Sequence, residues 1–202
     1  MSEHMALENL TVLDLTRVLA GPFCTMMLAD MGANVIKIEV PKGGDDTRSY
    51  PPFRAENLNG ERESVYFANI NRNKKGITLN LKAPEGKEIF KELVKKADVV
   101  VENYRPGVMD KLGLGYDVLK EINPRIIYAA VSGFGCYGPY HLRPGYDILA
   151  QAMGGMMSIT GSKGGEPTRA GSALGDILGG LHVTIGILAA VNARTITGKG
   201  QR

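Results

Sequence analysis

The residue with the clearest chemical potential is Asp176, which follows the small-residue segment Gly171-Ser-Ala-Leu-Gly and precedes the last apolar helical pattern. Small residues let the backbone turn tightly, and an aspartate here is expected at or next to the N-cap of the helix. Its carboxylate would face unpaired N–H groups and the positive helix end, which keep it ionised. An ionised, oriented and partly dehydrated carboxylate can attack a thioester. From spacing alone, simple helix capping is the commoner explanation of such an aspartate.

Other polar residues follow expected strands. Asn103 and its two successors come directly after the apolar run DVVVE, where they either contact an anionic ligand or are ordinary loop residues. Glu39 ends another strand about twenty residues after Gly21, where dinucleotide-binding proteins keep an acid for the ribose. The turn before it reads Leu19-Ala-Gly-Pro22 rather than G-x-G-x-x-G, and its proline removes a donor. Dinucleotide binding is therefore disfavoured.

The remaining basic and imidazole side chains give weaker signals. Lys74 and Lys75 are expected to be solvated surface charges rather than phosphate ligands. His182, on the last apolar helix, is expected to be a satisfied core histidine, and His141 lies in a Gly/Pro-rich loop. The three histidines and two cysteines are scattered singly, so no metal site is expected.

Composition describes a globular protein of one domain. The chain has 202 residues, of which 44% are hydrophobic and 22% charged, and its net charge of +3 does not suggest nucleic-acid binding. Two distant cysteines and a polar start without an apolar signal region make a reducing cytoplasm the expected compartment. The run Ile177–Val191 is short for a membrane span and contains glycines, so we expect a buried core helix and no membrane partner.

Short β-rich runs alternate with helical patterns along the chain. Strands are expected at residues 11–15, 34–39, 77–81, 98–102 and 125–131, and helices at 23–31, 84–97, 146–153 and 177–193, with one or two short helices within 106–122. A strand, a helix and a strand in about thirty residues form a βαβ unit with parallel pairing. The expected fold is an α/β open sheet with helices on both faces, which binds ligands at the carboxyl ends of its strands. The segment Lys42–Glu63 is expected to be a long functional loop.

Taken together, these segments resemble the family III CoA transferases, the group that contains the formyl-CoA:oxalate and carnitine CoA transferases. The resemblance runs from Leu10 to Arg202 and includes, in order, TVLDLTRVLAGPFCTMMLADMGANVIKIE, NRNKKGITLNLKAPEGKE, VVVENYRPGVMDKLGL, INPRIIYAAVSGFG, GPYHLRPGYDILAQAMGG, ALGD and TGKGQR. It implies a Rossmann-like, mainly parallel large domain plus a small domain. It also implies that CoA moves between an acyl-CoA and a free carboxylic acid through aspartyl anhydride and aspartyl-CoA thioester intermediates, with Asp176 as the nucleophile.

The same resemblance implies a set of positions that contact coenzyme A, the substrate carrier, with no metal involved. They are Leu19, Ala20, Leu79, Lys82, Asn103, Tyr104, Arg105, Lys111 and Tyr146. Arg and Lys among them would suit phosphate charges. One position departs from the family pattern, because Val40 stands where relatives often carry an arginine just after the acid of the second strand. Lys42 or Arg48 would have to meet the adenosine end instead.

Two alternatives to transfer were weighed. The related α-methylacyl-CoA racemases move an α-proton with an aspartate and a histidine of a G-H-D segment, but the matching segment here is Pro144-Gly-Tyr-Asp147. A tyrosine with a pKa near ~10 is a poor base at neutral pH, which favours transfer over racemisation. The second alternative is a non-catalytic CoA-binding fragment.

The resemblance also bears on domain extent, since members of the family are considerably longer than this chain. Residues 1–9 are expected to be an N-terminal extension, in which Met5 is a second candidate start, and residues 10–202 the N-terminal part of the large CoA-binding domain. The small domain and a Gly-rich loop that closes over the site would come later. The resemblance implies an interlocked homodimer for the full-length protein, and we expect the 202-residue piece alone to be inactive.

Overall fold

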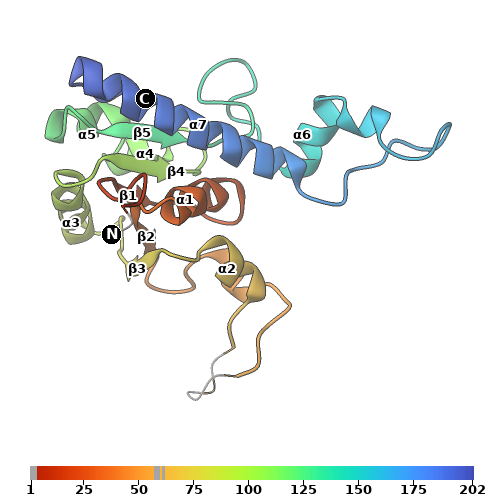
Figure 1. Ribbon diagram of the computed structural model, residues 1–202, viewed down its shortest axis with the longest axis horizontal. Coiled ribbons are helices and arrows are strands. Elements are labelled where there is room, and N and C mark those ends of the chain that lie inside the picture. Colours follow the sequence, from red (N-terminus) through yellow and green to blue (C-terminus); the bar gives the residue numbers. More distant parts are fainter. Residues whose placement is uncertain (1–3, 57–59, 61) are drawn as a thin grey trace.

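The structure, a computed structural model, describes residues 4–56, 60 and 62–202. Its centre is a five-stranded sheet in the order β3-β2-β1-β4-β5, in which every neighbouring pair is parallel (Figure 1). The strands are β1 (Thr11–Asp14), β2 (Asn34–Glu39), β3 (Lys75–Thr78), β4 (Val99–Glu102) and β5 (Ile127–Ala130). The chain runs outward from β1 to β3 and then returns to the other side of β1, so the strand order reverses between β1 and β4. Ligands of such sheets bind at this reversal.

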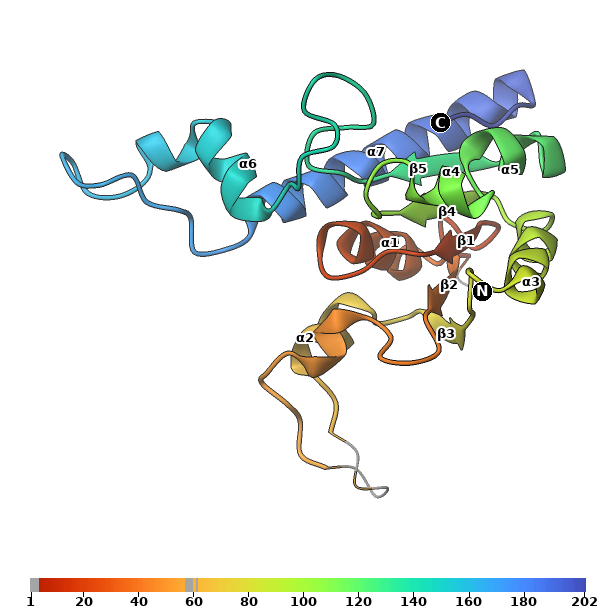
Figure 2. The same ribbon diagram turned by 180° about the vertical axis from the view of Figure 1, so that it is seen from behind.

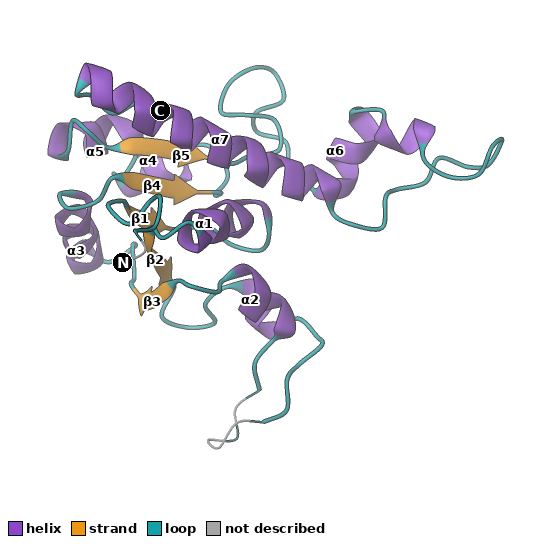
Figure 3. Ribbon diagram, viewed as in Figure 1, coloured by secondary structure: helices purple, strands orange, loops and turns teal. Residues whose placement is uncertain are grey.

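Helices cover both faces of the sheet, as Figures 2 and 3 show. One face carries α3 (Pro84–Val94), α4 (Val108–Leu112) and α5 (Tyr116–Ile122), and the other carries α1 (Ala20–Asp30) and α7 (Leu174–Thr197). The connection from β2 to β3 contains the short helices η1 (Asp46–Ser49) and α2 (Val65–Ile70), and α6 (Asp147–Met153) and η2 (Met156–Ile159) lie between β5 and α7. The expected open α/β sheet is confirmed.

The strands alternate between two buried clusters, because successive side chains of a strand point to opposite faces. Val12, Val99 and Val101 pack with α1 and α7, whereas Leu13 and Val100 pack with α3 to α5. Both faces of the central strands are thus covered, which explains why their sequences are continuous apolar runs.

Several boundaries differ from the sequence expectation. Helix α1 begins at Ala20 rather than Phe23, and Pro22 falls in its first turn, where a missing N–H leaves no intrahelical bond unmade. Strand β3 spans Lys75–Thr78 instead of residues 77–81, and the helix α2 had no sequence prediction. Part of the expected long loop, residues 57–59 and 61, lies outside the described residues.

Helix α7 is the largest correction. It is longer than expected, and it is buried along one stripe instead of on all sides. The buried residues of this stripe are Gly180, Thr184, Ile187, Ala190 and Arg194. His182 is exposed, not a core residue, because it lies off this stripe. By length and composition α7 passes as a membrane-spanning helix, the one such helix in the described part of the chain, yet its stripe packs on α1 and β5.

Candidate active site

Asp176 is the third residue of α7, so it lies inside the first turn and not at the N-cap, which is Ala173. Its side chain is half-buried. Burial raises the pKa of the Asp176 carboxyl, and the carboxylate of Asp147 raises it further. Tyr66 of α2 lies near enough that Asp176, after burial, raises the pKa of its phenol. Asp176 is therefore a partly dehydrated carboxylate of increased basicity at a helix N-terminus.

The start of α7 is capped by another helix, because Ala173 offers no side-chain acceptor. The N–H of Gly175 donates to Asp147 Oδ1 of α6 at 2.8 Å, and the other oxygen of Asp147 accepts from Gln151 Nε2 at 2.8 Å. Gln151 is fully buried and its Oε1 accepts the N–H of Ala170 at 2.8 Å. These bonds fix the backbone on both sides of Ser172, just before Asp176.

Glycines bring α7 close to the start of α1. A Cβ at Gly180 would lie 2.4 Å from the carbonyl oxygen of Ala20 and 3.2 Å from a ring carbon of Phe23. Asp176 precedes Gly180 by one helical turn and shares its face. The close packing of Gly180 on Ala20 therefore fixes the part of α7 that carries Asp176, whose titratable neighbours are Asp147 and Tyr66.

The residues expected to contact CoA follow the carboxyl ends of the strands, with the exceptions of Lys111 and Tyr146. Leu19 and Ala20 begin α1 after β1, Leu79 and Lys82 follow β3, and Asn103, Tyr104 and Arg105 follow β4. Two groups are joined directly, because Asn103 Oδ1 accepts the N–H of Arg17 at 2.8 Å and Asn103 Nδ2 donates to the Arg17 carbonyl at 2.7 Å. Lys111 lies exposed in α4, and Tyr146, 67% exposed, precedes the first residue of α6.

Two charged pairs that the sequence analysis did not identify lie under this end of the sheet. Lys74 Nζ contacts Asp14 Oδ2 at 3.0 Å, and Lys37 Nζ contacts Asp45 Oδ2 at 2.9 Å, with all four side chains at most 2% exposed. Burial alone would raise the pKa of Asp14, but Lys74 and Lys37 hold it below its ordinary value. The expectation that Lys74 is a surface charge is wrong, because its ammonium is enclosed by Asp14, the Pro22 carbonyl and Asn71.

Of the two residues expected to meet the adenosine end instead of an arginine at position 40, Lys42 is exposed and Arg48 is paired with Glu39. Arg48, a candidate to replace the arginine missing at Val40, donates two hydrogen bonds to Glu39 and stacks over the ring of Phe67 at 3.8 Å. Val40 is 50% exposed. Glu39, buried beside β3, also accepts the N–H of Asp45 at 2.8 Å.

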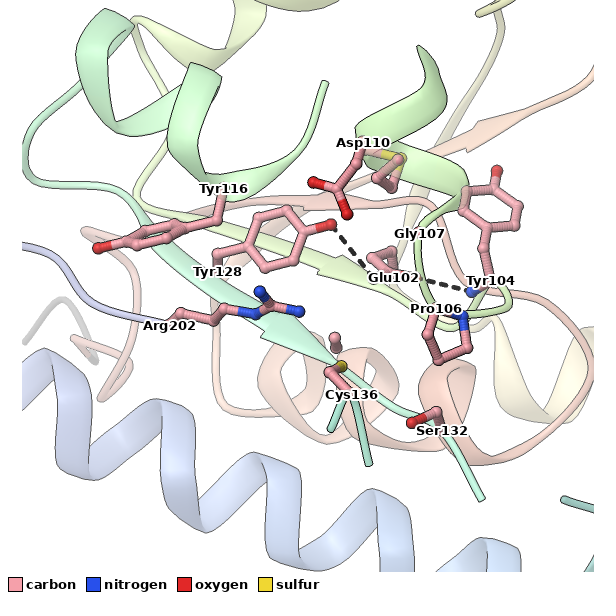
Figure 4. Close-up of a pocket in the computed structure, with 12 residues that line it drawn as sticks. Glu102, Tyr104, Pro106, Gly107, Asp110, Tyr116, Tyr128, Ser132, Cys136 and Arg202 are labelled. Carbon is pink, nitrogen blue, oxygen red and sulfur yellow. Dashed lines mark hydrogen bonds between the residues drawn. The ribbon is translucent and has the colours of Figure 1, made fainter. Parts of the chain in front are cut away.

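A small polar pocket lies between the ends of β4 and β5 (Figure 4). Glu102 Oε2 accepts the N–H of Tyr104 at 2.7 Å, and Glu102 Oε1 accepts the Tyr128 hydroxyl at 3.2 Å. Burial raises the pKa of Glu102 to about 7, although these hydrogen bonds and Arg202 oppose it. Ser132 Oγ, which also lines the pocket, is buried with no hydrogen-bond partner. Asp176 does not line this pocket.

In the described residues, no three His, Cys, Asp or Glu side chains gather in a way that could hold a metal ion. The missed charged pairs did leave a signal in the sequence. Asp14 and Lys37 interrupt the runs TVLDL and NVIKIE, which otherwise read as strands buried on both faces. A charge at such a position must be paired with another buried charge.

The chain is similar to known proteins over almost its whole length. Residues 7–202 match the family described as CoA-transferase family III. An acetyl-CoA:oxalate CoA-transferase of Acetobacter aceti is 51% identical over 194 residues, which cover 96% of this chain and 48% of the relative. A succinyl-CoA:glutarate CoA-transferase of Mus musculus is 51% identical over 195 residues, covering 96% of this chain and 43% of the relative.

The solved structures agree as well. A CAIB/BAIF family protein from Brucella suis superposes with a TM-score of 0.93 at 46% identity, and the match covers 98% of this chain and 52% of that chain. The chain thus spans about half the length of the relatives and of this neighbour.

Proposed function

The chain belongs to CoA-transferase family III, and from that premise we propose that the whole protein transfers CoA between an acyl-CoA thioester and a free carboxylic acid. Relatives about half identical to this chain carry the names of oxalate, mesaconate and glutarate CoA-transferases. In this proposal the acyl group of the donor and the carboxylate acceptor therefore both derive from small carboxylic acids. Coenzyme A enters as part of the substrate.

The proposed nucleophile is Asp176. Its carboxylate attacks the thioester carbonyl and expels CoA thiolate, which leaves a mixed anhydride. The thiolate then attacks the aspartyl carbonyl, releases the donor acid as a carboxylate and forms an aspartyl-CoA thioester. The acceptor carboxylate attacks that thioester and gives a second anhydride, and the thiolate takes its acyl group to complete the new acyl-CoA. Asp176 returns as a carboxylate, and no net proton is consumed.

The observation that carries the proposal is the state of Asp176. Burial and the nearby Asp147 raise the pKa of its carboxyl, and a more basic carboxylate is a better nucleophile. Its position in the first turn of α7 also places it at the positive end of the helix dipole, and two N–H groups of that turn are already paired, Leu174 with the Ser172 carbonyl and Gly175 with Asp147.

The residues proposed to bind CoA are those that follow the strand ends, together with Lys111 and Tyr146. Lys82, Arg105 and Lys111 are exposed cations that suit phosphate groups. Tyr146, which stands where a racemase would have its histidine, supports transfer over proton abstraction. We also propose, from the family resemblance, that residues 10–202 form the first part of a CoA-binding domain and that the whole protein is a cytoplasmic homodimer.

Trapping of the acyl-enzyme tests the proposal. Full-length protein incubated with acyl-CoA and hydroxylamine should carry a hydroxamate on the peptide that contains Asp176, detected by mass spectrometry. Asp176→Asn should abolish the adduct and lower turnover by at least about 10³-fold, as expected when a covalent nucleophile is lost. Asp117→Asn, on the exposed face of α5, is the matched control and should behave as the wild type.

The thermal stability of Asp176→Asn tests whether Asp176 serves as a nucleophile or only stabilises the start of α7 as a helix cap. A carboxyl whose pKa is raised by folding contributes stability below its unfolded pKa, and this is lost as pH rises through the folded pKa. Charged Asp176 therefore lowers stability at pH 7, and Asp176→Asn should melt at or above the wild-type temperature. Normal turnover by Asp176→Asn, or α-deuterium exchange in a 2-methylacyl-CoA without transfer to an acid, would overturn the proposal.

A further inference from the structure

The turn between β1 and α1 contains a backbone conformation that its residue type disfavours. Val18 has φ of 68°, in the left-handed region, and besides Val18 and Asn73 the described residues with positive φ are glycines. A β-branched residue there is a steric outlier, and such strain persists only where the surroundings enforce it.

The surroundings of the turn supply that enforcement from four places in the chain. Thr16 N–H donates to Asp14 Oδ1 at 2.9 Å, and the Thr16 carbonyl accepts Lys37 Nζ at 2.9 Å. The N–H and carbonyl of the next residue, Arg17, are both held by the amide of Asn103, as described above.

The hydrogen bond to Val18 itself is accepted by Asp45. The N–H of Val18 donates to Asp45 Oδ1 at 3.2 Å, and the same oxygen accepts the N–H of Thr47 at 3.0 Å and its hydroxyl at 2.8 Å. Asp45 Oδ2 accepts Lys37 Nζ. One carboxylate therefore joins the strained residue to β2 through Lys37 and to η1 through Thr47.

The buried Lys37–Asp45 pair contributes little net free energy to the stability of the fold. Both side chains are at most 2% exposed, and removing two charges from water costs several kcal/mol per ion, which their attraction recovers only with good geometry. Apolar residues of similar volume often serve stability equally well. The pair is better explained by the position that it gives to Asp45 Oδ1, the oxygen that accepts the N–H of Val18.

The held turn leads directly into the segment on which α7 packs. Ala20, two residues after Val18, touches α7 at Gly180, and Asp176 lies one helical turn before Gly180 on the same face. A shift of the turn at Ala20 would therefore shift the part of α7 that carries Asp176. A displacement of about 1 Å at a reacting centre can lower a rate about 10²-fold.

We propose that Asp45, oriented by Lys37, is a positioning residue for acyl transfer, which holds Val18 in its left-handed conformation and thereby fixes Ala20, on which the part of α7 that carries Asp176 packs. The proposal rests on the proposed function of Asp176.

Two double variants of the full-length protein isolate the acceptor oxygen from the charge. Both carry Lys37→Met, so the ion pair is absent from each. In the first, Asp45→Asn keeps an oxygen that can accept from Val18, and in the second, Asp45→Leu has the same shape without an acceptor. Steady-state turnover, KM for acyl-CoA, the rate of hydroxamate formation at Asp176 and thermal unfolding are measured for each.

The variant with Asp45→Leu should have a kcat at least about tenfold below that with Asp45→Asn, with KM values for acyl-CoA within about threefold of each other, because the turn sets the geometry of reaction more than binding. Asp98→Asn is the control, because it breaks the Arg194–Asp98 ion pair just before the first residue of β4, at the other end of that strand. It should lower the melting temperature without lowering kcat relative to KM. Equal kcat in the two double variants overturns the proposal.

Single substitutions at Val18 keep the test decisive if Asp45→Leu does not fold. Val18→Gly takes the left-handed conformation without steric cost and keeps the N–H that Asp45 accepts, so it should keep the wild-type kcat. Val18→Pro cannot take a positive φ and has no N–H to donate, so its kcat should be at least about tenfold lower. Equal kcat in these two variants would refute positioning. Absence of any hydroxamate at Asp176 in the wild type would instead refute the proposed function, so the two failures are distinguishable.

Discussion

Glu102 is a carboxylic acid that the fold keeps from ionising fully at neutral pH. Its side chain is 7% exposed at the end of β4, and burial raises the pKa to about 7 from an ordinary value of 4.5. The folded protein therefore binds this proton more tightly than the unfolded chain does. Stability from this group is complete below pH 4.5 and is lost as pH rises through about 7.

Glu102→Gln should remove that pH dependence, because glutamine keeps an oxygen for the Tyr104 N–H and cannot ionise. The gap between the two pKa values corresponds to on the order of 3 kcal/mol. We expect the variant to exceed the wild type in unfolding free energy by on the order of 2–3 kcal/mol at pH 9 and to match it at pH 4.5. Urea unfolding at both pH values checks this, with exposed Glu121→Gln as control, and equal stabilities at pH 9 would contradict it.

For single residues, the sequence singled out the carboxylate that we propose as nucleophile but not the buried charged pairs around the strand ends. Asp176 was recognisable because ALGD precedes a long apolar helix and matches a family motif, and Lys37 was visible as a charge inside NVIKIE. The partners of such charges cannot be predicted locally, since Lys74 reaches Asp14 across sixty positions of chain. For that reason the polar run NRNKK wrongly predicts a surface position for Lys74.

Among the elements, the packing of α1 on α7 determines where Asp176 lies. The contact depends on Gly180, because any Cβ there would collide with the Ala20 carbonyl. Neighbouring Gly179 has open space around its missing side chain and is a matched site on the same helix.

Gly180→Ala should therefore push α7 away from α1, with a loss of about 1–3 kcal/mol, the usual cost of overpacking. Gly179→Ala should leave stability unchanged or raise it by up to about 1 kcal/mol, because alanine favours helix. Chemical denaturation measures both. Gly180→Ala should also slow formation of the acyl adduct at Asp176, and a variant as stable as Gly179→Ala would show that the contact does not constrain the helix.

Element types were more predictable than their ends. Four strands were expected within about two residues of their observed limits, because buried parallel strands form continuous apolar runs. Strand β3 was misplaced, since it lies at the sheet edge with all four residues exposed and carries no apolar pattern. The first turn of α1 was missed because Pro22 looked like a loop residue, although the N–H that proline lacks would have been unpaired there.

For the molecule as a whole, the alternation of strands and helices predicted the open parallel sheet but not its strand order, β3-β2-β1-β4-β5. How far the surface of α7 is covered could not be predicted, because apolar residues occur all around that helix. Large apolar side chains stay exposed on it, with Leu178 at 41%, Ile185 at 55% and Ile196 at 82%. A groove of about 710 Å³ lies between α7 and β5.

The isolated 202-residue chain should self-associate through this surface, since monomers rarely expose continuous apolar patches. Ile185→Lys combined with Ile196→Lys should weaken the association, so that the sedimentation coefficient varies less with concentration. Val118→Lys, an exposed apolar position on α5, serves as control. Association that persists unchanged in the double variant would mean that another face is responsible.

The contact between Ala20 and Gly180 joins positions 160 residues apart in the chain. Contacts of such long range form late, after the loop between them has closed. During synthesis, β1 and its turn leave the ribosome well before α7 does. A nascent chain that already has the turn and the strand ends would still lack Asp176 in place, so the proposed acyl transfer could not begin until the last helix has docked.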